Sequence, residues 1–119
     1  MLERLASPEN VLAFRAVGKV EAADYDYTLD PAVGDMLKSQ DELRFVYVLG
    51  EDFEGYSLAA VWEDTKLGVG HVSQWKRIAV VSNHDWVRHA LGMFGWMVPG
   101  EVKVFPLEAQ TSALEWAAG

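Results

Sequence analysis

The sequence contains no cysteine among its 119 residues, which excludes disulfides and thiol chemistry. A chain without cysteine is typical of the cytosol, and we expect a cytoplasmic protein. No run approaches the ~20 apolar residues that a helix needs to cross a bilayer. The segment Met1-Leu2-Glu3-Arg4 lacks a basic stretch followed by an apolar one, so we expect no signal peptide.

Basic residues are also scarce. Ten Lys and Arg against 18 Asp and Glu give a net charge of −8. A field of this sign repels phosphate backbones, whereas nucleic-acid binders usually carry a basic stripe. The local basic spots at Lys76-Arg77 and Arg88-His89 are small, so we expect no nucleic-acid partner. Any contact with a membrane must then depend on apolar side chains rather than on anionic lipid.

Linkers, repeats and low-complexity runs are absent, while half of the residues are hydrophobic. A chain of this length and composition can bury a core, so residues 1–119 are predicted to form one domain. The hydrophobic period alternates between strand-like and helix-like segments. Strands are predicted at 2–5, 11–17, 43–49, 77–81 and 101–105. Helices are predicted at 21–39, 58–72, 85–94 and 111–118.

The element order β-β-α-β-α-β-α-β-α predicts an α/β fold with a mostly parallel sheet and right-handed crossovers. Pro31 interrupts the first helical region, which leaves two alternatives. The helix kinks there, or Asp30 caps a second helix with Pro31 at its first position. Ser82 and Asp85 stand at capping-box spacing. The polar segment 50–55 is predicted to be a connector.

Several segments occur together in one order along nearly the whole chain. They are Asp24-Tyr25 with Leu29 and Pro31, Phe53-Glu54-Gly55-Tyr56, Trp62-x-Asp64-x-Lys66-x-Gly68-x-x-His71, Arg77-Ile78-Ala79-Val80-Val81 with Trp86, and Gly100-Glu101-Val102-Lys103-x-Phe105. In these segments the chain resembles the SpoIIAA-like family, which is related to STAS domains and sometimes grouped with Sec14-type lipid-binding modules. The resemblance implies a stacked βα superhelix of about four turns, without an established enzymatic activity or cofactor.

STAS relatives act as anti-sigma-factor antagonists that are switched by phosphorylation of a serine in an Asp-Ser-Ser-Gly type motif. That serine begins the helix after the central strand. The corresponding stretch here is Gly55-Tyr56-Ser57-Leu58, so Ser57 is the candidate phosphorylation site, but the aspartate and the following glycine are absent. From the residues alone, Ser57 has three interpretations: a helix cap, a contact for a ligand or phosphate, or a nucleophile without an assignable base.

Four polar or aromatic residues of the following helix belong to the resemblance: Trp62, Asp64, Lys66 and His71. The resemblance places them in a polar patch beside a pocket. Asp64 and His71 share a helix face but lie ~10 Å apart along it, too far for a direct acid–base pair. Lys66 can reach Glu63 in an ion pair, so the residue chemistry by itself favours hydrogen bonding on a helix surface.

The three histidines never occur at metal-ligand spacing, since His84 and His89 point about 140° apart on a helix. We therefore predict no metal site. The resemblance, together with a serine that has no assignable base, predicts no enzymatic activity, and we expect no cofactor. Phe53, Tyr56 and Trp62 are candidates for lining a hydrophobic pocket at the carboxyl end of the central strand, where parallel sheets tend to bind ligands.

The apolar segment 94–99 follows a helix, where polar residues are usual. Phe94, Trp96 and Met97 have several interpretations there. They fold onto the core, contact a second copy of the chain in a homodimer, line a ligand entrance, or enter a membrane interface.

Two functions follow from these candidates. The leading hypothesis is a non-enzymatic binding module for a small apolar or amphiphilic, lipid-like ligand, with peripheral membrane contact. Its candidate ligand-binding residues are Phe53, Tyr56, Ser57, Trp62, Asp64, Lys66 and His71. The alternative is a regulatory domain that binds a protein partner in the STAS manner, with Ser57 as its switch.

Overall fold

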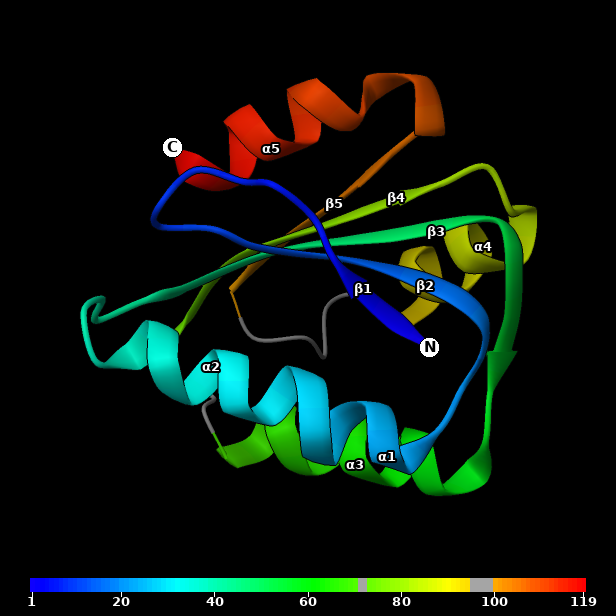
Figure 1. Cartoon of the computed structure of the whole chain (residues 1–119). Coiled ribbons are helices and arrows are strands. Elements are labelled where there is room, and N and C mark those ends of the chain that lie inside the picture. The colour runs from blue at the N-terminus through cyan, green and yellow to red at the C-terminus, as the bar shows by residue number, and fades with distance from the viewer. Residues whose placement is uncertain (71–72, 95–99) are drawn as a thin grey trace.

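The computed structural model describes residues 1–70, 73–94 and 100–119, and a five-stranded sheet runs through its centre (Figure 1). The strands are β1 (Leu2–Arg4), β2 (Leu12–Val20), β3 (Leu43–Tyr56), β4 (Trp75–Ser82) and β5 (Glu101–Phe105). They lie side by side in chain order, with β1 antiparallel to β2 and all other pairs parallel. The predicted α/β class and the mostly parallel sheet are confirmed.

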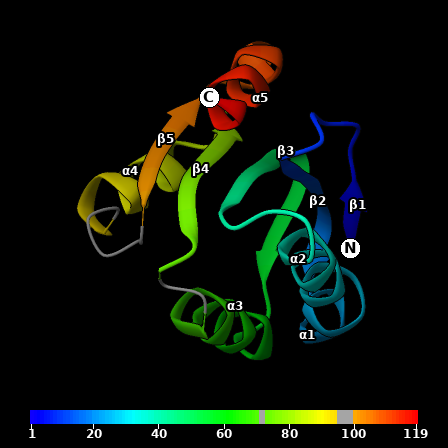
Figure 2. The ribbon, with the colours of Figure 1, turned by 90° about the vertical axis from the view of Figure 1, so that its left-hand side faces the viewer.

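The helical segments are α1 (Ala22–Asp24), the π-helix η1 (Tyr25–Leu29), α2 (Asp30–Leu37), α3 (Leu58–Gly70), α4 (Asp85–Phe94), the 3₁₀ helix η3 (Leu107–Ala109) and α5 (Gln110–Ala118). Parallel strands that follow one another in one direction place their right-handed crossovers on one face. Accordingly, α1, α2 and α3 cover one face of the sheet, and α5, which follows the last strand, covers the other (Figures 1 and 2). Within the described residues, no helix is both long and apolar enough to cross a membrane.

The sheet is buried on both faces, as the continuous apolar run in β3 predicts. Phe45, Tyr47 and Leu49 belong to the core beneath α1, α2 and α3. The intervening Val46 and Val48 belong to the core beneath α5. Side chains of a strand alternate between its faces, so every second residue of β3 faces the same helix layer.

The predicted helix at 21–39 is helical from Ala22 to Leu37 but contains one wide turn. The N–H of Asp30 donates to the carbonyl of Tyr25, five residues back. Asp30 has helical backbone angles (φ −57°, ψ −46°), so the alternative in which Asp30 caps a second helix is wrong. Pro31 lies in the first turn of α2 and has no N–H to donate, and the wide turn that precedes it accommodates this.

The prediction of a connector at 50–55 is wrong, because β3 continues as a strand to Tyr56. Its end pairs with an extension of β2, which runs past Gly18 to Val20. Gly18 (φ 63°) and Gly55 (φ 114°) have positive φ at the irregular points of this pairing, a conformation that glycine adopts without steric cost. Because of this extension, Phe53 and Tyr56 belong to the sheet and pack in or against its core.

The predicted capping box of α4 is also wrong. Ser82 is the last residue of β4, and its buried hydroxyl accepts a 3.1 Å hydrogen bond from the N–H of His84. The helix begins only at Asp85. Ser82 therefore stabilises the strand-to-helix turn instead of the first turn of the helix.

Candidate binding site

The site is built where β3 ends and α3 begins. Ser57 stands between them, and its Oγ accepts a 3.1 Å hydrogen bond from the N–H of Ala60. The N–H of Ser57 donates to the carbonyl of Val20 at 2.9 Å. A serine that accepts from the third residue of a helix is an N-cap, so the interpretation of Ser57 as a cap is confirmed. This cap and the strand pairing together hold the start of α3 beside β2.

A second contact joins α3 to the π-helix. The hydroxyl of Tyr25, a fully buried residue, donates a 2.8 Å hydrogen bond to Oδ1 of Asp64. Asp64 as a residue lies at the surface of α3, while this bond lies in a partly buried position. The wide turn of η1 begins at Tyr25, so the irregular helix and α3 meet at this phenol.

Two further tyrosines lie next to this bond. Tyr47 on β3 is 8% exposed, and its ring meets the ring of Tyr56 edge-on with centroids 6.4 Å apart. The Tyr47 hydroxyl interacts electrostatically with the phenols of Tyr25 and Tyr56. It is buried, yet it has no partner with proper hydrogen-bond geometry in the described part of the chain.

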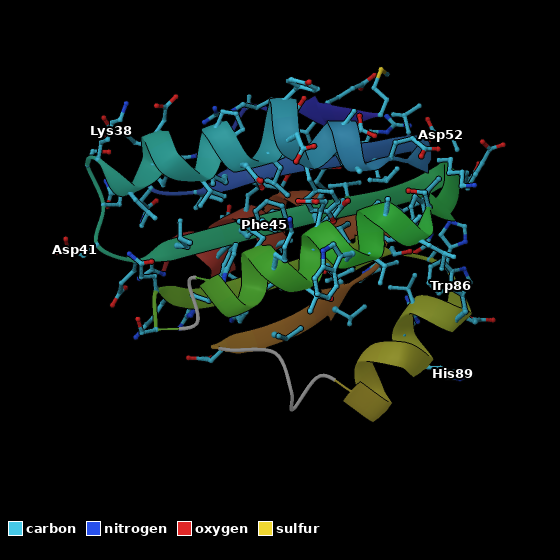
Figure 3. The ribbon with its side chains drawn as sticks, turned by 90° about the horizontal axis from the view of Figure 1, so that it is seen from below. Lys38, Asp41, Phe45, Asp52, Trp86 and His89 are labelled. Atoms are coloured by element: carbon cyan, nitrogen blue, oxygen red, sulfur yellow. The ribbon has the colours of Figure 1, made fainter. Side chains whose placement is uncertain are left out.

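An aromatic layer continues from Tyr47 along the sheet. Phe45 packs edge-to-face with Tyr47 (centroids 5.4 Å apart) and with Trp75 of β4 (6.2 Å), and stacks on Phe14 of β2 (6.1 Å). In Figure 3 Phe45 lies between α2 and α3, on the face of the sheet that these two helices cover. The indole Nε1 of Trp75 is buried and, like the Tyr47 hydroxyl, has no hydrogen-bond partner among the described residues.

Burial raises the pKa of the four acidic groups that lie together here, those of Tyr25, Tyr47, Tyr56 and Asp64. Loss of hydration raises the pKa of Tyr47 to about 12, although the interaction of its hydroxyl with the phenols of Tyr56 and Tyr25 opposes the rise. Burial and the nearby Asp64 carboxylate raise the pKa of Tyr25, and burial and Tyr47 raise that of Tyr56. Burial also raises the pKa of Asp64, and the hydrogen bond from Tyr25 offsets part of that rise. The three phenols are therefore neutral groups near neutral pH.

The candidate Phe53 is buried in a separate aromatic group at the far end of β3. Its ring meets Tyr56 (centroids 5.3 Å apart) and His84 (6.1 Å) and stacks with Trp86 (5.9 Å). The His84 ring is fixed by a 2.8 Å hydrogen bond between Nε2 and the carbonyl of Gly50. Tyr56 thus connects the Phe53 group with the tyrosine cluster.

Trp62, which was predicted to line one pocket with Phe53 and Tyr56, has no described ring contact with Phe53. Trp62 lies on the outer face of α3 and is 63% exposed, beside Leu58, which is 92% exposed. Lys66 forms the predicted ion pair with Glu63, with Nζ and Oε1 3.0 Å apart. Of the candidates on this helix, Asp64 alone is placed by a described contact in the buried cluster. His71, Trp96 and Met97 lie outside the described residues, as does the side chain of Phe94 at the end of α4.

Three carboxylates, those of Asp26, Asp30 and Glu63, come within 4.8 Å of one another where η1 and α2 meet α3. In the described ranges this is the grouping that comes nearest to a metal site. Lys66 neutralises part of its charge through Glu63. An acidic surface group of this kind is ordinary, and it gives no reason to place an ion here.

Sequence reasoning missed Tyr47 and Trp75 as site residues. Tyr47 has a detectable signal, because its position in β3 puts it on the same face as Phe45 and on the side where helices must cross. Trp75 lay outside the predicted strand 77–81, which the structure extends to Trp75–Ser82. Tyr25 was matched to the family pattern, but no pattern paired it with Asp64, 39 residues away.

Comparison with known proteins gives one consistent result. A family model described as SpoIIAA-like matches residues 11–118. A crystal structure of an uncharacterised protein of the DUF3478 family with a SpoIIAA-like fold, from Shewanella loihica PV-4, is similar with a TM-score of 0.78 and 31% identity, covering 98% of this chain and 92% of that one. Comparison with curated proteins finds no match. No catalytic family is indicated.

Proposed function

The chain belongs to the SpoIIAA-like family, and we propose that this member is a binding module for a small amphiphilic molecule held between α3 and the sheet. One observation carries the proposal. Two hydrogen-bond donors, the Tyr47 hydroxyl and Trp75 Nε1, are buried without a partner in the described residues, and both rings pack against Phe45. Each such group costs ~1–3 kcal/mol, and native proteins contain few. A ligand that accepts hydrogen bonds would remove this cost.

The surroundings suit the apolar part of such a molecule. Phe14 and Phe45 supply ring surface, and the partly buried Leu67 of α3 and Ile78 of β4 pack against the same core. The helix α3 packs chiefly against α1 and η1 rather than against the strands. Its distance from the sheet is therefore set by the packing of side chains and not by backbone hydrogen bonds to the strands.

The exposed face of α3 supports a contact with a lipid surface as part of the same proposal. Leu58, Val61 and Trp62 lie three and four residues apart on one face, and all are exposed. Tryptophan is enriched at membrane interfaces. The net charge of −8 favours an uncharged surface over an anionic one. In a flotation assay with phosphatidylcholine vesicles, we expect the double variant Leu58→Ser, Trp62→Ser to float less than wild type.

The binding proposal is tested by native mass spectrometry of the gently purified chain, together with thermal unfolding in the presence of decyl-chain compounds with different headgroups. We expect a bound mass beyond the chain itself, or a rise in Tm, because a ligand present at 100 times its Kd stabilises the folded state by about 2.7 kcal/mol. The variant Tyr47→Phe should weaken binding, and Tyr27→Phe, which alters an exposed tyrosine, should not. A chain of unaltered mass whose Tm no compound changes would contradict the proposal.

A further inference from the structure

The sheet ends at β5, and the outer edge of this strand pairs with no other strand among the described residues. β5 is hydrogen-bonded to β4 alone, through a parallel ladder that runs from Arg77 opposite Glu101 to Val81 opposite Phe105. Figure 2 shows β5 as the last strand, at the side of the sheet opposite β1. An edge strand presents a row of unpaired N–H and C=O groups to which a further strand can be added.

Two side chains of opposite charge lie on one face of this edge strand. Glu101 and Lys103 are two residues apart, so they point to the same side of the sheet, and both are exposed. The Lys103 ammonium lies 5.1 Å from the centre of the Phe105 ring and forms no ion pair within the described ranges. Glu101 approaches the guanidinium of Arg77 only to 3.9 Å. Both charges are therefore available to a partner.

Symmetry restricts how such a strand can pair with a copy of itself. In an antiparallel pair, hydrogen-bonded and non-hydrogen-bonded residue pairs alternate along the strands. A two-fold axis makes the two pairs on either side of it identical, which is compatible with this alternation only if one residue lies on the axis opposite its own copy. The axis of a symmetric β5 pair must therefore pass through a single residue.

Of the residues in β5, Val102 alone gives a register that pairs opposite charges. An axis at Val102 sets Glu101 of each copy opposite Lys103 of the other, and sets the partly buried Val102 opposite itself. An axis at Glu101 or Lys103 would set like charges opposite each other. An axis at Val104 or Phe105 would set both charges opposite apolar residues. Cross-strand pairs of opposite charge and pairs of β-branched residues both stabilise a sheet.

The other edge of the sheet does not match β5 in this way. β1 has three residues, Leu2–Arg4. Its charged residues Glu3 and Arg4 are adjacent, so they point to opposite faces and cannot both meet Glu101 and Lys103. A contact from β5 of one copy to β1 of the next would also repeat without closing, whereas a contact from β5 to β5 closes as a dimer.

We propose that β5 pairs with the β5 of a second copy of this chain, antiparallel about a two-fold axis at Val102. The two five-stranded sheets then continue as one sheet through the dimer. This homodimer goes beyond the proposed binding function and does not depend on it. Because five residues of each copy form the strand contact, the dimer should be weak, with a Kd on the order of micromolar.

Sedimentation velocity of the full chain over a range of concentrations tests the proposal. Lys103→Glu sets two carboxylates opposite each other twice, and Glu101→Lys sets two ammonium groups opposite each other twice. Each variant should therefore raise the Kd of the dimer at least tenfold at low salt, and less at high salt. Lys38→Glu, which makes the same change of charge at the exposed end of α2, is the control and should leave the Kd nearly unchanged.

Mixing the two β5 variants provides the sharpest measurement. A heterodimer of Lys103→Glu with Glu101→Lys restores both pairs of opposite charge, so the mixture should dimerise about as tightly as wild type. Far-ultraviolet circular dichroism verifies that each variant is folded. Hydrogen exchange of the wild-type amides at 101–105 should slow at high protein concentration, and exchange at the β1 edge should not.

Three outcomes overturn the proposal. The first is a wild-type chain that stays monomeric up to millimolar concentration. The second is a dimer whose Kd neither β5 variant changes, or whose formation leaves exchange in β5 unaltered, because the copies then meet elsewhere. The third is a pair of monomeric variants that do not associate when they are mixed, because charge pairing in this register then does not hold the copies together.

Discussion

The hydroxyl of Tyr25 donates a 2.8 Å hydrogen bond to Oδ1 of Asp64, and so joins the π-helix η1 to α3 across 39 residues of chain. The bond fixes the helix layer over the face of the sheet that carries Tyr47. The packing of α3 against η1 is therefore stabilised in part by this pair of residues.

Replacing Tyr25 with phenylalanine should destabilise the fold by about 1–2 kcal/mol, because it removes a hydrogen bond to a charged acceptor from a partly buried position. Urea unfolding followed by circular dichroism measures this change. Tyr27→Phe is the matched control, since Tyr27 is 83% exposed on the same helix, and it should stay within ~0.5 kcal/mol of wild type. Equal stability of the Tyr25→Phe chain would show that the bond contributes nothing to holding α3.

Asp64 should make stability depend on pH. Its pKa is raised in the folded protein by burial, above the value of 3.8 that it has when unfolded. The folded state therefore binds the proton more tightly, so this contribution to stability is complete below the unfolded pKa and is lost as pH rises through the folded pKa. The free energy of unfolding of wild type relative to Asp64→Asn should accordingly fall as pH rises above about 3.8. A difference between the two curves that is flat, or that rises with pH, would contradict this assignment.

The cap at Ser57 should be measurable by substitution. Ser57→Ala removes the acceptor for the N–H of Ala60 and should cost about 1 kcal/mol in the free energy of unfolding. Ser57→Asp retains an acceptor of nearly equal capping strength, so it should lose less stability than the alanine variant. Identical losses in the two variants would mean that the hydroxyl is not acting as a cap.

The same variants test the regulatory alternative, in which Ser57 is a phosphorylation switch. If it is, Ser57→Asp and Ser57→Ala should recover different sets of protein partners in affinity capture from cell extract. Both variants binding every recovered partner as wild type does would remove the switch hypothesis. The stability measurements show beforehand whether either variant is folded well enough to compare.

Gly100, at the start of β5, should not tolerate a side chain. Its φ is +78°, and a Cβ would lie 2.6 Å from the carbonyl oxygen of Trp75 and 2.9 Å from that of Lys76. We expect Gly100→Ala to lower the free energy of unfolding by more than about 2 kcal/mol, because backbone must move to relieve both the clash and the strain. Gly34→Ala in α2 is the control, since its Cβ meets nothing within 4 Å. It should stabilise the chain by up to ~1 kcal/mol.

Much of the fold could be predicted from the sequence, since the hydrophobic period reports directly which side of an element is buried. The five strands, the order of helices and the two-sided burial of β3 follow from it. The errors lie where pairing with a distant segment overrides the local signal. The segment 50–55 is polar and contains glycine, yet it continues as a strand because β2 offers an edge as far as Val20. Asp30 resembles a cap, but the π-turn that begins at Tyr25 keeps it within a helix.

Less of the candidate site could be predicted. Local patterns identified Ser57 as a cap and Lys66 as the partner of Glu63, because both contacts span three residues of one helix. They also selected Trp62, which is apolar and at helical spacing, although it lies on the outer face of α3. Nothing local distinguishes an apolar residue that faces the core from one that faces solvent when most of the helix is apolar.

By itself, the sequence determined an α/β fold of alternating strands and helices, without thiols and with an acidic charge. These properties are sums over residues or repeats of short period, so they can be read before folding. Only the tertiary structure decided that Tyr25, Tyr47, Tyr56 and Asp64 lie together and that two buried donors, on Tyr47 and Trp75, lack a partner among the described residues. Burial and hydrogen bonding between distant segments are properties of the packed chain, because they exist only once α3 is folded over the sheet.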